Sequence, residues 1–550
     1  MSYKTPVAML YQWEKTIPDS IYLKQPVARE FHDYTWKETA NQVRRMAAYL
    51  KSLGYPEGTK IALMSKNCAH WVMADLAIMM AGYVSVPLYP NLTSETIRQI
   101  LEHSESKLLF VGKLDGYAEM KSGIPEGVKC VSFPYSMYQT TKEYEDWDDI
   151  IAKTEPMSDN YDPPMGNLGT IIYTSGTTGV PKGVMHNFEQ LSFTGYFTIK
   201  ETDSGVNERF FSYLPLSHCA ERLLCELGTL YCGGTIYFAE NLDTFAEDLQ
   251  RAKPTVFLAV PRIWTKFQDG ILAKLPQKKL NILLNVPVVN GLIRKKIKVG
   301  LGLDQARLMV SGAAPIPKSM LYWYQKLDIT ILEAYGMTEN MAYSHFTQPD
   351  SWKPGTVGKV WPGVETRISS EGEIQVKSKA TMVGYYKEPD KTAEMLDGEY
   401  LKTGDQGEID PDGTLRITGR IKDLFKTSKG KYVTPSPIEL KFSASDAVEC
   451  VCLVGSGLPQ PVAVVTKSEV GKKMSESDLS KSLTDLMKTI NSGLDAHERV
   501  SHIFVSNDDW TVENGVLTPT MKIKRNIVES KYGTKCEAIQ ADRERKVVSE

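Results

Sequence analysis

The sequence lacks the features that mark a secreted, membrane-spanning or zinc-clustered protein. No stretch reaches the roughly 18 consecutive apolar residues that a helix needs to cross a bilayer. Charges and a proline interrupt the first 20 residues, so we expect no secretion signal there. The eight cysteines form no CxxC pair, which argues against a structural zinc site. We expect reduced thiols and a cytoplasmic protein.

Neither sign of charge dominates the chain. Lysine and arginine number 64 against 67 aspartate and glutamate residues, which gives a formal net charge of −3. Such a balance exerts no general attraction on nucleic acid, so we expect no nucleic-acid partner. We also find no internal repeat and no low-complexity tract. The composition is that of a large soluble enzyme.

The length and the apolar content allow several hydrophobic cores. The 550 residues are 42% hydrophobic, and at roughly 150 residues per domain they would form two to four units. Helical and strand patterns alternate up to about residue 365, with strand-like runs at 60–64 and 84–88 and a helical pattern between them. This alternation predicts a layered α/β fold with mostly parallel strands.

The pattern changes twice after residue 365. Residues 366–420 show period-two alternation and Asp-Gly turns, which predict antiparallel hairpins. A Lys-, Ser- and Pro-rich connection follows, and then patterns typical of a compact α+β domain. We therefore predict an α/β fold class with a large N-terminal domain at 1–420, comprising α/β subdomains at 1–365 and a β-rich subdomain at 366–420. The C-terminal domain is predicted at 421–550.

Residues 168–184, LGTIIYTSGTTGVPKGV, combine a strand pattern with a loop suited to anions. Hydroxyl groups, backbone N–H groups and glycines can turn toward one phosphate, and a lysine adds a mobile cation. The spacing differs from a P-loop, because Pro181 stands where that pattern has its second glycine. A polar turn without a ligand is the alternative. The predicted contacts to ATP phosphates are Thr174, Ser175, Gly176, Thr177, Thr178, Gly179 and Lys182.

The decapeptide TSGTTGVPKG resembles the signature loop of the AMP-forming adenylating enzymes, which include acyl-CoA synthetases, luciferases and nonribosomal adenylation domains. Further motifs of that family follow in order along nearly the whole chain. The segments LPLSHCAER and YYKEPDKTAEMLDGEYLKTGDQGEI are most similar to long-chain fatty acyl-CoA synthetases. The resemblance implies a large N-terminal domain and a small C-terminal domain that rotates between two half-reactions.

A second motif, ITILEAYGMTE at 329–339, places a hydroxyl group and a carboxylate side by side. A carboxylate near a phosphate site needs a bridging cation such as Mg²⁺, although the same letters could start a helix. The resemblance implies Thr338 near the α-phosphate, Glu339 and Thr178 on the metal, and Tyr335 beside adenine. It adds to the ATP site the neighbouring residues Glu333, Ala334 and Gly336 and the small residues Gly312, Ala313 and Ala314.

Two further segments gain meaning from the resemblance. Asp405 in YLKTGD would ordinarily bond its own backbone in a turn, but here it matches the carboxylate that binds both ribose hydroxyls. Arg420 is implied as a second ribose or phosphate contact. Charges and a glycine in GRIKDLFK suit a hinge. The resemblance places the pivot at Lys422, with Lys426 and Gly430 facing the site during the CoA step.

A lysine near the C-terminus is implied as the cation of the first reaction step. Attack of a carboxylate on a phosphate joins two anions, so a positioned cation lowers the barrier. We assign this role to Lys522, although the usual preceding glycine is Met521 here and Lys524 is an alternative. His218 corresponds to a histidine in the segment that lines the acyl pocket of the family. A lone histidine would otherwise be a packing or surface residue.

The activity that the resemblance implies has two steps. A long- or medium-chain fatty acid and ATP give acyl-AMP and pyrophosphate, and CoA then displaces AMP. ATP, Mg²⁺ and CoA are the expected cofactors. An acyl-AMP ligase or acyl-carrier-protein synthetase with a phosphopantetheine acceptor is the first alternative, and a non-catalytic nucleotide- or lipid-binding protein is the second. The motifs do not indicate which acyl chain length is preferred. A homodimer is compatible with the sequence.

Residues 271–303 are the best candidate for membrane contact. There the apolar run ILLNVPVVNGLI precedes the basic cluster RKKIK, a combination that suits an anionic lipid surface. Prolines and asparagines interrupt the run, and we favour a buried helix or loop over peripheral membrane contact.

Overall fold

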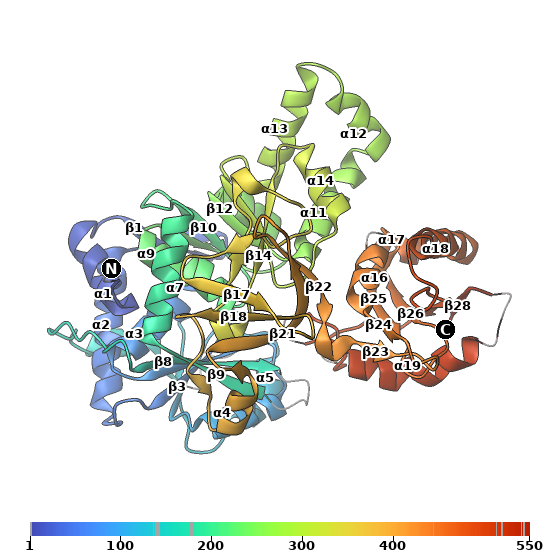
Figure 1. The fold of residues 1–550 in the computed structure, drawn as a ribbon. Helices are drawn as coiled ribbons and strands as arrows, with labels where there is room; N and C mark the ends of the chain where they lie inside the picture. The colour runs from blue at the N-terminus through green and yellow to red at the C-terminus, as the bar shows by residue number, and fades with distance from the viewer. Residues whose placement is uncertain are drawn as a thin grey trace.

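The computed structural model describes residues 3–135, 137, 144–175, 181–443, 445–512, 514–518, 521–540, 542 and 545–550. Figure 1 shows a large body built from the first part of the chain and a smaller C-terminal domain beside it. The predicted α/β class, with a large N-terminal and a small C-terminal domain, is confirmed. In the described part of the chain, no helix has both the length and the apolar character needed to span a bilayer.

Two large sheets form the N-terminal body. The nine-stranded sheet has the order β16 (Lys359–Val360), β15 (His345–Phe346), β14 (Ile331–Tyr335), β13 (Leu308–Ser311), β12 (Val256–Ala259), β10 (Arg209–Ser212), β11 (Thr235–Phe238), β1 (Ile21–Val27), β2 (Glu30–Thr35). The eight-stranded sheet has the order β19 (Gly384–Tyr385), β9 (Pro181–Asn187), β8 (Leu168–Ser175), β4 (Val84–Leu88), β3 (Lys60–Met64), β5 (Leu108–Val111), β6 (Lys129–Ser132), β7 (Glu145–Asp146). Most neighbours in both sheets are parallel, as the alternation of helices and strands predicted.

Helices connect the strands and cover the sheets. They are α1 (Pro6–Thr16), α2 (Trp36–Ser52), α3 (Ala69–Met80), α4 (Ser94–Ser104), α5 (Tyr117–Met120), α6 (Trp147–Lys153), α7 (Phe188–Glu201), α8 (Cys219–Glu221), the π-helical turn η3 (Arg222–Leu227), α9 (Gly228–Cys232), α10 (Phe245–Ala252), α11 (Pro261–Lys274), α12 (Gln277–Leu284), α13 (Val289–Leu301), α14 (Lys318–Gln325) and α15 (Pro389–Glu394). Helix α2 begins at Trp36, because Thr35 and Glu38 form a capping box there.

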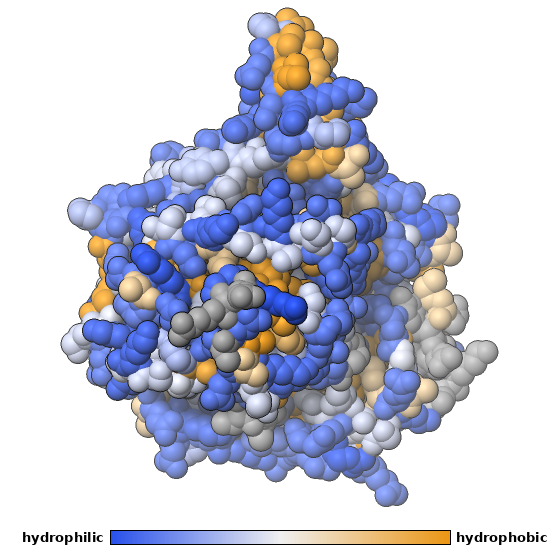
Figure 2. Space-filling view, turned by 90° about the vertical axis from the view of Figure 1, so that its right-hand side faces the viewer, coloured by the Kyte–Doolittle hydropathy of each residue, from blue (hydrophilic) through white to orange (hydrophobic). Residues whose placement is uncertain are grey.

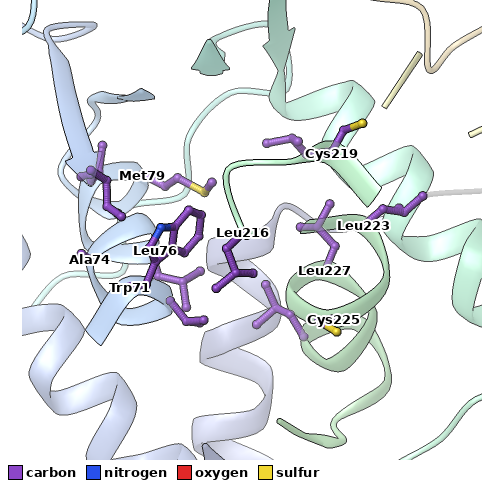
Figure 3. Packing of buried hydrophobic residues seen from close by; sticks show 14 of the residues in the cluster. Trp71, Ala74, Leu76, Met79, Leu216, Cys219, Leu223, Cys225 and Leu227 are labelled. Atoms are coloured by element: carbon purple, nitrogen blue, oxygen red, sulfur yellow. The ribbon is translucent and has the colours of Figure 1, made fainter. Parts of the chain in front are cut away.

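Helix α3 lies at the centre of the body. Each of its twelve residues is buried, and it contacts β1 of one sheet and β3 and β4 of the other. A helix that is buried on all sides requires such a position between two layers. Figure 3 shows Trp71 of α3 beside Leu216, with Leu227 of η3 on the facing side. The helix therefore joins the two sheets through one continuous core.

A third sheet forms the β-rich region. Its strands are β17 (Val364–Ile368), β18 (Glu373–Ser378), β21 (Tyr400–Ile409) and β20 (Leu396–Asp397), with β22 (Leu415–Arg420) paired to β21. The predicted antiparallel hairpins at the two Asp-Gly turns are confirmed, with Gly398 at φ 62° and Gly413 at φ 83°. Glycine suits both turns because side chains disfavour positive φ.

The small domain follows residue 420. It holds the strand pair β23 (Phe425–Lys426) and β24 (Tyr432–Val433), and a four-stranded sheet of β25 (Val448–Val454), β26 (Val462–Lys467), β27 (His502–Ser506) and β28 (Val547–Ser549). Its helices are α16 (Pro435–Phe442), α17 (Glu469–Lys473), α18 (Glu476–Asn491) and α19 (Arg525–Ile539). Two apolar clusters fill it, one on each side of the sheet.

A buried helix or loop was expected at 271–303. The segment is helical, but the expected burial is wrong. Residues 277–301 form the helices α12 and α13, which project from the large domain (Figure 1), and α13 has no buried residue. Composition suggested burial because the segment is rich in leucine, isoleucine and valine. The helices pack against the body on one side only, which leaves the other apolar side chains exposed.

A buried ionic network crosses the core. Arg222 donates to Asp75 of α3 over 2.6 Å, to Glu226 over 3.0 Å and to the hydroxyl of Thr170 in β8 over 2.8 Å. Arg222 and Asp75 have no exposed side-chain surface. Burial acts to lower the pKa of Arg222, but the two carboxylates raise it overall, so the guanidinium stays charged. The network ties α3, β8 and η3 together.

Replacing Arg222 with methionine should destabilise the large domain by about 3–5 kcal/mol, because two buried carboxylates would lose their cation. Urea denaturation followed by tryptophan fluorescence measures the loss. Arg98→Met is the matched control, since its pair with Glu102 is exposed and should contribute less than about 0.5 kcal/mol. Equal stability of both variants would contradict a structural role for the network.

Candidate active site

The loops after β13 and β14 approach each other at the carboxyl ends of two neighbouring parallel strands. A Cβ on Gly312 would lie 3.3 Å from the carbonyl oxygen of Ala334, and Ala313 has φ 65° and is exposed. A Cβ on Gly336 would lie 2.4 Å from the carbonyl carbon of Ala342, so only glycine fits there. Ligands of α/β sheets commonly bind at such strand ends.

The predicted phosphate loop connects β8 and β9. The two strands pair up to Thr174 with Lys182 and Ser175 with Pro181, so β8 and β9 form a hairpin. The ammonium of Lys182 lies 5.1 Å from the ring centre of Tyr385. Gly176, Thr177, Thr178 and Gly179, and with them the predicted metal contact of Thr178, lie outside the described residues.

Glu339 and Thr338 lie against β9 of this hairpin and the neighbouring strand β19. Glu339 accepts a hydrogen bond from the hydroxyl of Tyr385 over 2.7 Å. His186 of β9 donates from Nε2 to the carbonyl oxygen of Thr338 over 2.7 Å. The Thr338 hydroxyl lies 3.6 Å from the sulfur of Cys219. The predicted pair is thus fixed against the strand that follows the phosphate loop.

Asp405 links the β-rich sheet to the nucleotide loops. Its carboxylate accepts from the hydroxyl of Tyr335 over 2.7 Å and from Nε of Arg420 over 2.8 Å. Asp405 and Arg420 are direct partners across β21 and β22, which explains how residues 15 positions apart meet. The structure thus brings together all three residues that the resemblance placed at the adenosine.

His218 is half-buried and lies in a neutral form. It caps α8, and its Nδ1 accepts from the backbone N–H of Ala220 over 3.2 Å. Burial lowers the pKa of His218 to about 4, and the positive charge of Lys522 adds to the effect. At neutral pH the imidazole is uncharged beside the predicted acyl segment.

Lys522 reaches this group from the small domain. The residue keeps solvent-exposed surface. Desolvation by the protein around it lowers its pKa, as does the charge of Arg420, whereas Asp405 and Glu339 act in the opposite direction. Met521 has φ 63°, a conformation that favours glycine, which explains why the family pattern has glycine before the lysine. Lys524 instead occupies the N-cap position of α19.

The residues predicted for the hinge and the CoA step lie on the small-domain side. Lys422 is in the short 3-10 turn at Ile421–Asp423, directly after β22. Lys426 lies 5.5 Å from the ring centre of Tyr432, and Gly430 has φ 77° in the turn of the same strand pair. An ion pair between Arg262 and Glu449 joins the two domains near α11 and β25.

Two family models match this chain. The AMP-binding enzyme model covers residues 11–386, and the AMP-binding enzyme C-terminal domain model covers 422–544. The chain belongs to the AMP-binding enzyme family. The predicted resemblance to AMP-forming adenylating enzymes is confirmed.

Curated relatives and solved structures agree with this assignment. A long-chain-fatty-acid–CoA ligase of Mycobacterium bovis, FadD15, is 29% identical over 97% of this chain and 96% of its own. The mouse long-chain-fatty-acid–CoA ligase 5 is 30% identical over 90% and 82%. The adenylation domain of a carboxylate reductase from Mycobacterium chelonae superposes with a TM-score of 0.81 at 25% identity, covering 98% and 91%. The anthranilate CoA ligase AuaEII has a TM-score of 0.80 at 20% identity, covering 98% of both chains.

Three residues of this AMP-binding enzyme were missed by sequence reasoning. Tyr385, His186 and Cys219 contact Glu339 or Thr338 through side chains that lie 46 to 152 positions away in sequence. Tyr385 belongs to the quoted YYKEP segment, whose order gives no hint of a contact with Glu339. The signal is the strand pairing of β19 with β9, which only the fold reveals.

Glu333, predicted in the ATP site, uses its carboxylate to accept the backbone N–H of Gly355 over 2.9 Å. Burial raises its pKa to about 7, against a smaller lowering by that N–H group. Because the folded-state pKa lies above the ordinary value, Glu333 supports folding below about pH 4.5 and loses this effect as the pH rises through 7.

We therefore expect the effect of Glu333→Gln on the free energy of unfolding, measured against wild type at the same pH, to be more stabilising at pH 8 than at pH 4.5. The effects at the two pH values should differ by up to about 3 kcal/mol. Urea denaturation at the two pH values measures this difference. Glu371→Gln, at an exposed site of the same chain, should show no such dependence. A pH-independent effect of Glu333→Gln would contradict the raised pKa.

Proposed function

We propose that this AMP-binding enzyme activates a long- or medium-chain fatty acid with ATP and transfers the acyl group to CoA. The carboxylate would attack the α-phosphate to give acyl-AMP and pyrophosphate, and the CoA thiol would then displace AMP. The observation that carries the proposal is the convergence of Lys522 from the small domain with Glu339 and Asp405 of the large domain. The names of the curated relatives support a fatty acid as substrate.

We assign the first step to charges held in fixed positions. The loop between β8 and β9, with Lys182, would hold the β- and γ-phosphates. Asp405 would accept the ribose hydroxyls, in place of or beside its present donors Tyr335 and Arg420. Lys522 would stabilise the charge that develops at the α-phosphate, near Thr338. The lowered pKa of Lys522 reflects desolvation. In a desolvated position one ammonium interacts with phosphate charge more strongly than it would in water.

Glu339 fits a shared Mg²⁺ site. No cluster of three or more histidine, cysteine or carboxylate side chains that could hold a metal ion occurs among the described residues. One oxygen of Glu339 accepts from Tyr385, and the carboxylate can still offer further lone pairs. Hard divalent cations take carboxylate and phosphate oxygens together, so Glu339 would bind Mg²⁺ jointly with ATP. When bound, Mg²⁺ would neutralise phosphate charge.

The second step would require the small domain to rotate. With Lys522 directed at the large domain, the present arrangement suits adenylation. Lys422 would act as the pivot, and Lys426 and Gly430 would replace Lys522 at the site. The rotation would break the Arg262–Glu449 ion pair, which is exposed and therefore weak.

We also propose that the protein works in the cytoplasm.

A pyrophosphate exchange assay with fatty acids of graded length tests the proposal. We expect exchange that depends on ATP and fatty acid, with an optimum at medium or long chains. Thioester formation is then measured separately with CoA and with a phosphopantetheinylated carrier protein. Product with the carrier alone would favour the acyl-carrier-protein synthetase, and exchange without product would favour the acyl-AMP ligase. Absence of exchange with every acid would favour the non-catalytic protein.

Lys522→Ala should lower pyrophosphate release by about 100-fold or more, because it removes the cation of the first step. Thioester formation from supplied acyl-AMP should change far less, since that step would use the rotated domain. Lys524→Ala is the matched control and should leave pyrophosphate release near the wild-type rate. Equal losses in both half-reactions would contradict the assignment of Lys522, and a larger loss for Lys524→Ala would transfer the role to it.

A further inference from the structure

Residues 277–301, here called the α12–α13 hairpin, are fixed to the large domain at their base. Leu280 is buried in the same apolar cluster as Leu321 and Tyr324 of α14. Trp323 donates from its indole nitrogen to Gln277 over 2.7 Å, and Gln250 donates to the carbonyl oxygen of Gly300 over 2.6 Å. The hairpin is therefore a firmly supported projection, visible at the top of Figure 1.

The outer surface of the hairpin is unusually apolar for exposed protein. Among the described residues, sixteen large apolar side chains are exposed, and five of them lie within these 25 positions. Val288 at the turn is 79% exposed and Ile282 is 65% exposed. Figure 2 shows the resulting apolar cap at the tip of the projection. Apolar side chains gathered in this way mark an interaction surface. The five are Ile282, Val286, Val288, Leu292 and Val299.

Positive charge surrounds this apolar surface. The hairpin contains six lysine and arginine residues and no aspartate or glutamate, although the whole chain has a net charge of −3. On α13, Leu292, Lys295, Lys296 and Val299 are spaced to share one exposed face, while Ile293 and Ile297 face the body. The six basic residues are Lys278, Lys279, Arg294, Lys295, Lys296 and Lys298.

The turn at the tip of the hairpin holds Val288 in an unfavourable backbone conformation. Val288 has φ 68° and ψ −49°, a backbone conformation that β-branched residues rarely adopt. Such strain persists only where the surrounding structure enforces it and is concentrated at functional segments. Both ends of the hairpin are fixed at the base, so the strain falls on the exposed tip.

We propose that the outer surface of the α12–α13 hairpin docks on an anionic lipid bilayer, with the valines of the turn in the acyl-chain boundary and the lysines at the headgroups. Apolar residues rimmed by lysine match the two layers of a lipid interface, and the acidic residue that pairs with the hairpin, Asp328, binds Arg294 on the side that faces the body. A protein partner fits less well, since lysine is depleted at protein interfaces. The inference goes beyond the proposed activity and does not depend on it.

Vesicle sedimentation without substrates tests the docking surface. The full chain should sediment with phosphatidylcholine vesicles that contain 30 mol% phosphatidylglycerol and much less with phosphatidylcholine alone. Val288→Asp combined with Leu292→Asp should weaken binding at least tenfold. Leu242→Asp is the matched control, because Leu242 is 81% exposed elsewhere on the large domain and its replacement should leave binding unchanged. Thermal melts check that each variant folds.

A double charge-reversal variant measures the electrostatic contribution to vesicle binding. Lys295→Glu with Lys296→Glu should weaken binding to the anionic vesicles more than tenfold, since each basic residue near such a surface contributes about fivefold. Lys481→Glu with Lys488→Glu, on the exposed face of α18, makes the same charge change and should have little effect. Equal binding by both pairs, or no binding by wild type, would overturn the proposal. So would a dimer in sedimentation velocity that Val288→Asp with Leu292→Asp abolishes, because the surface would then serve a second copy.

Discussion

The arrangement of the large domain depends on the burial of α3 and of the ion network beside it. A helix that is buried on every side has to lie between two layers, and α3 accordingly joins the two large sheets. Asp75 of this helix holds Arg222, which also binds Thr170 of β8. Strand β8 leads into the predicted phosphate loop, and Arg222 follows four residues after His218. The same contacts that close the core therefore set the distance between two parts of the candidate active site.

The candidate site combines charges that no single element could hold. Glu339 follows a strand of the nine-stranded sheet, Tyr385 forms the edge of the eight-stranded sheet, and Asp405 lies in the β-rich sheet. Lys522 comes from the small domain and completes the group. Because the lysine is on a separate domain, a rotation of that domain would bring its charge to the site or withdraw it. This division would suit the proposed mechanism, in which two steps use one nucleotide site.

The α12–α13 hairpin follows a different physical rule from the rest of the large domain. Its inner residues pack as any amphipathic helix does, but its outer face keeps apolar side chains in water beside lysines. Burial elsewhere in the body removes such side chains from solvent. The exposed face is thus a local exception, and its chemistry is that of an interface with lipid.

Much of the fold was predictable, because local patterns encode it. Strands β3 and β4 have the bounds of the strand-like runs that the sequence shows at 60–64 and 84–88. Motif order identified the family and named Asp405, Glu339 and Lys522 as candidates. Contacts between distant residues were not predictable, since Tyr385 meets Glu339 only through the pairing of β19 with β9.

By itself, the sequence determined the class of fold, the family and the types of charge that the site contains. Only the tertiary structure brings the charge of Lys522 close enough to interact with those of Asp405 and Glu339, whereas Lys524 occupies the N-cap position of α19. The tertiary structure also leaves one face of residues 277–301 exposed. A helix of this composition can be buried or exposed. Only the packing of neighbouring elements determines which of its faces are shielded from water.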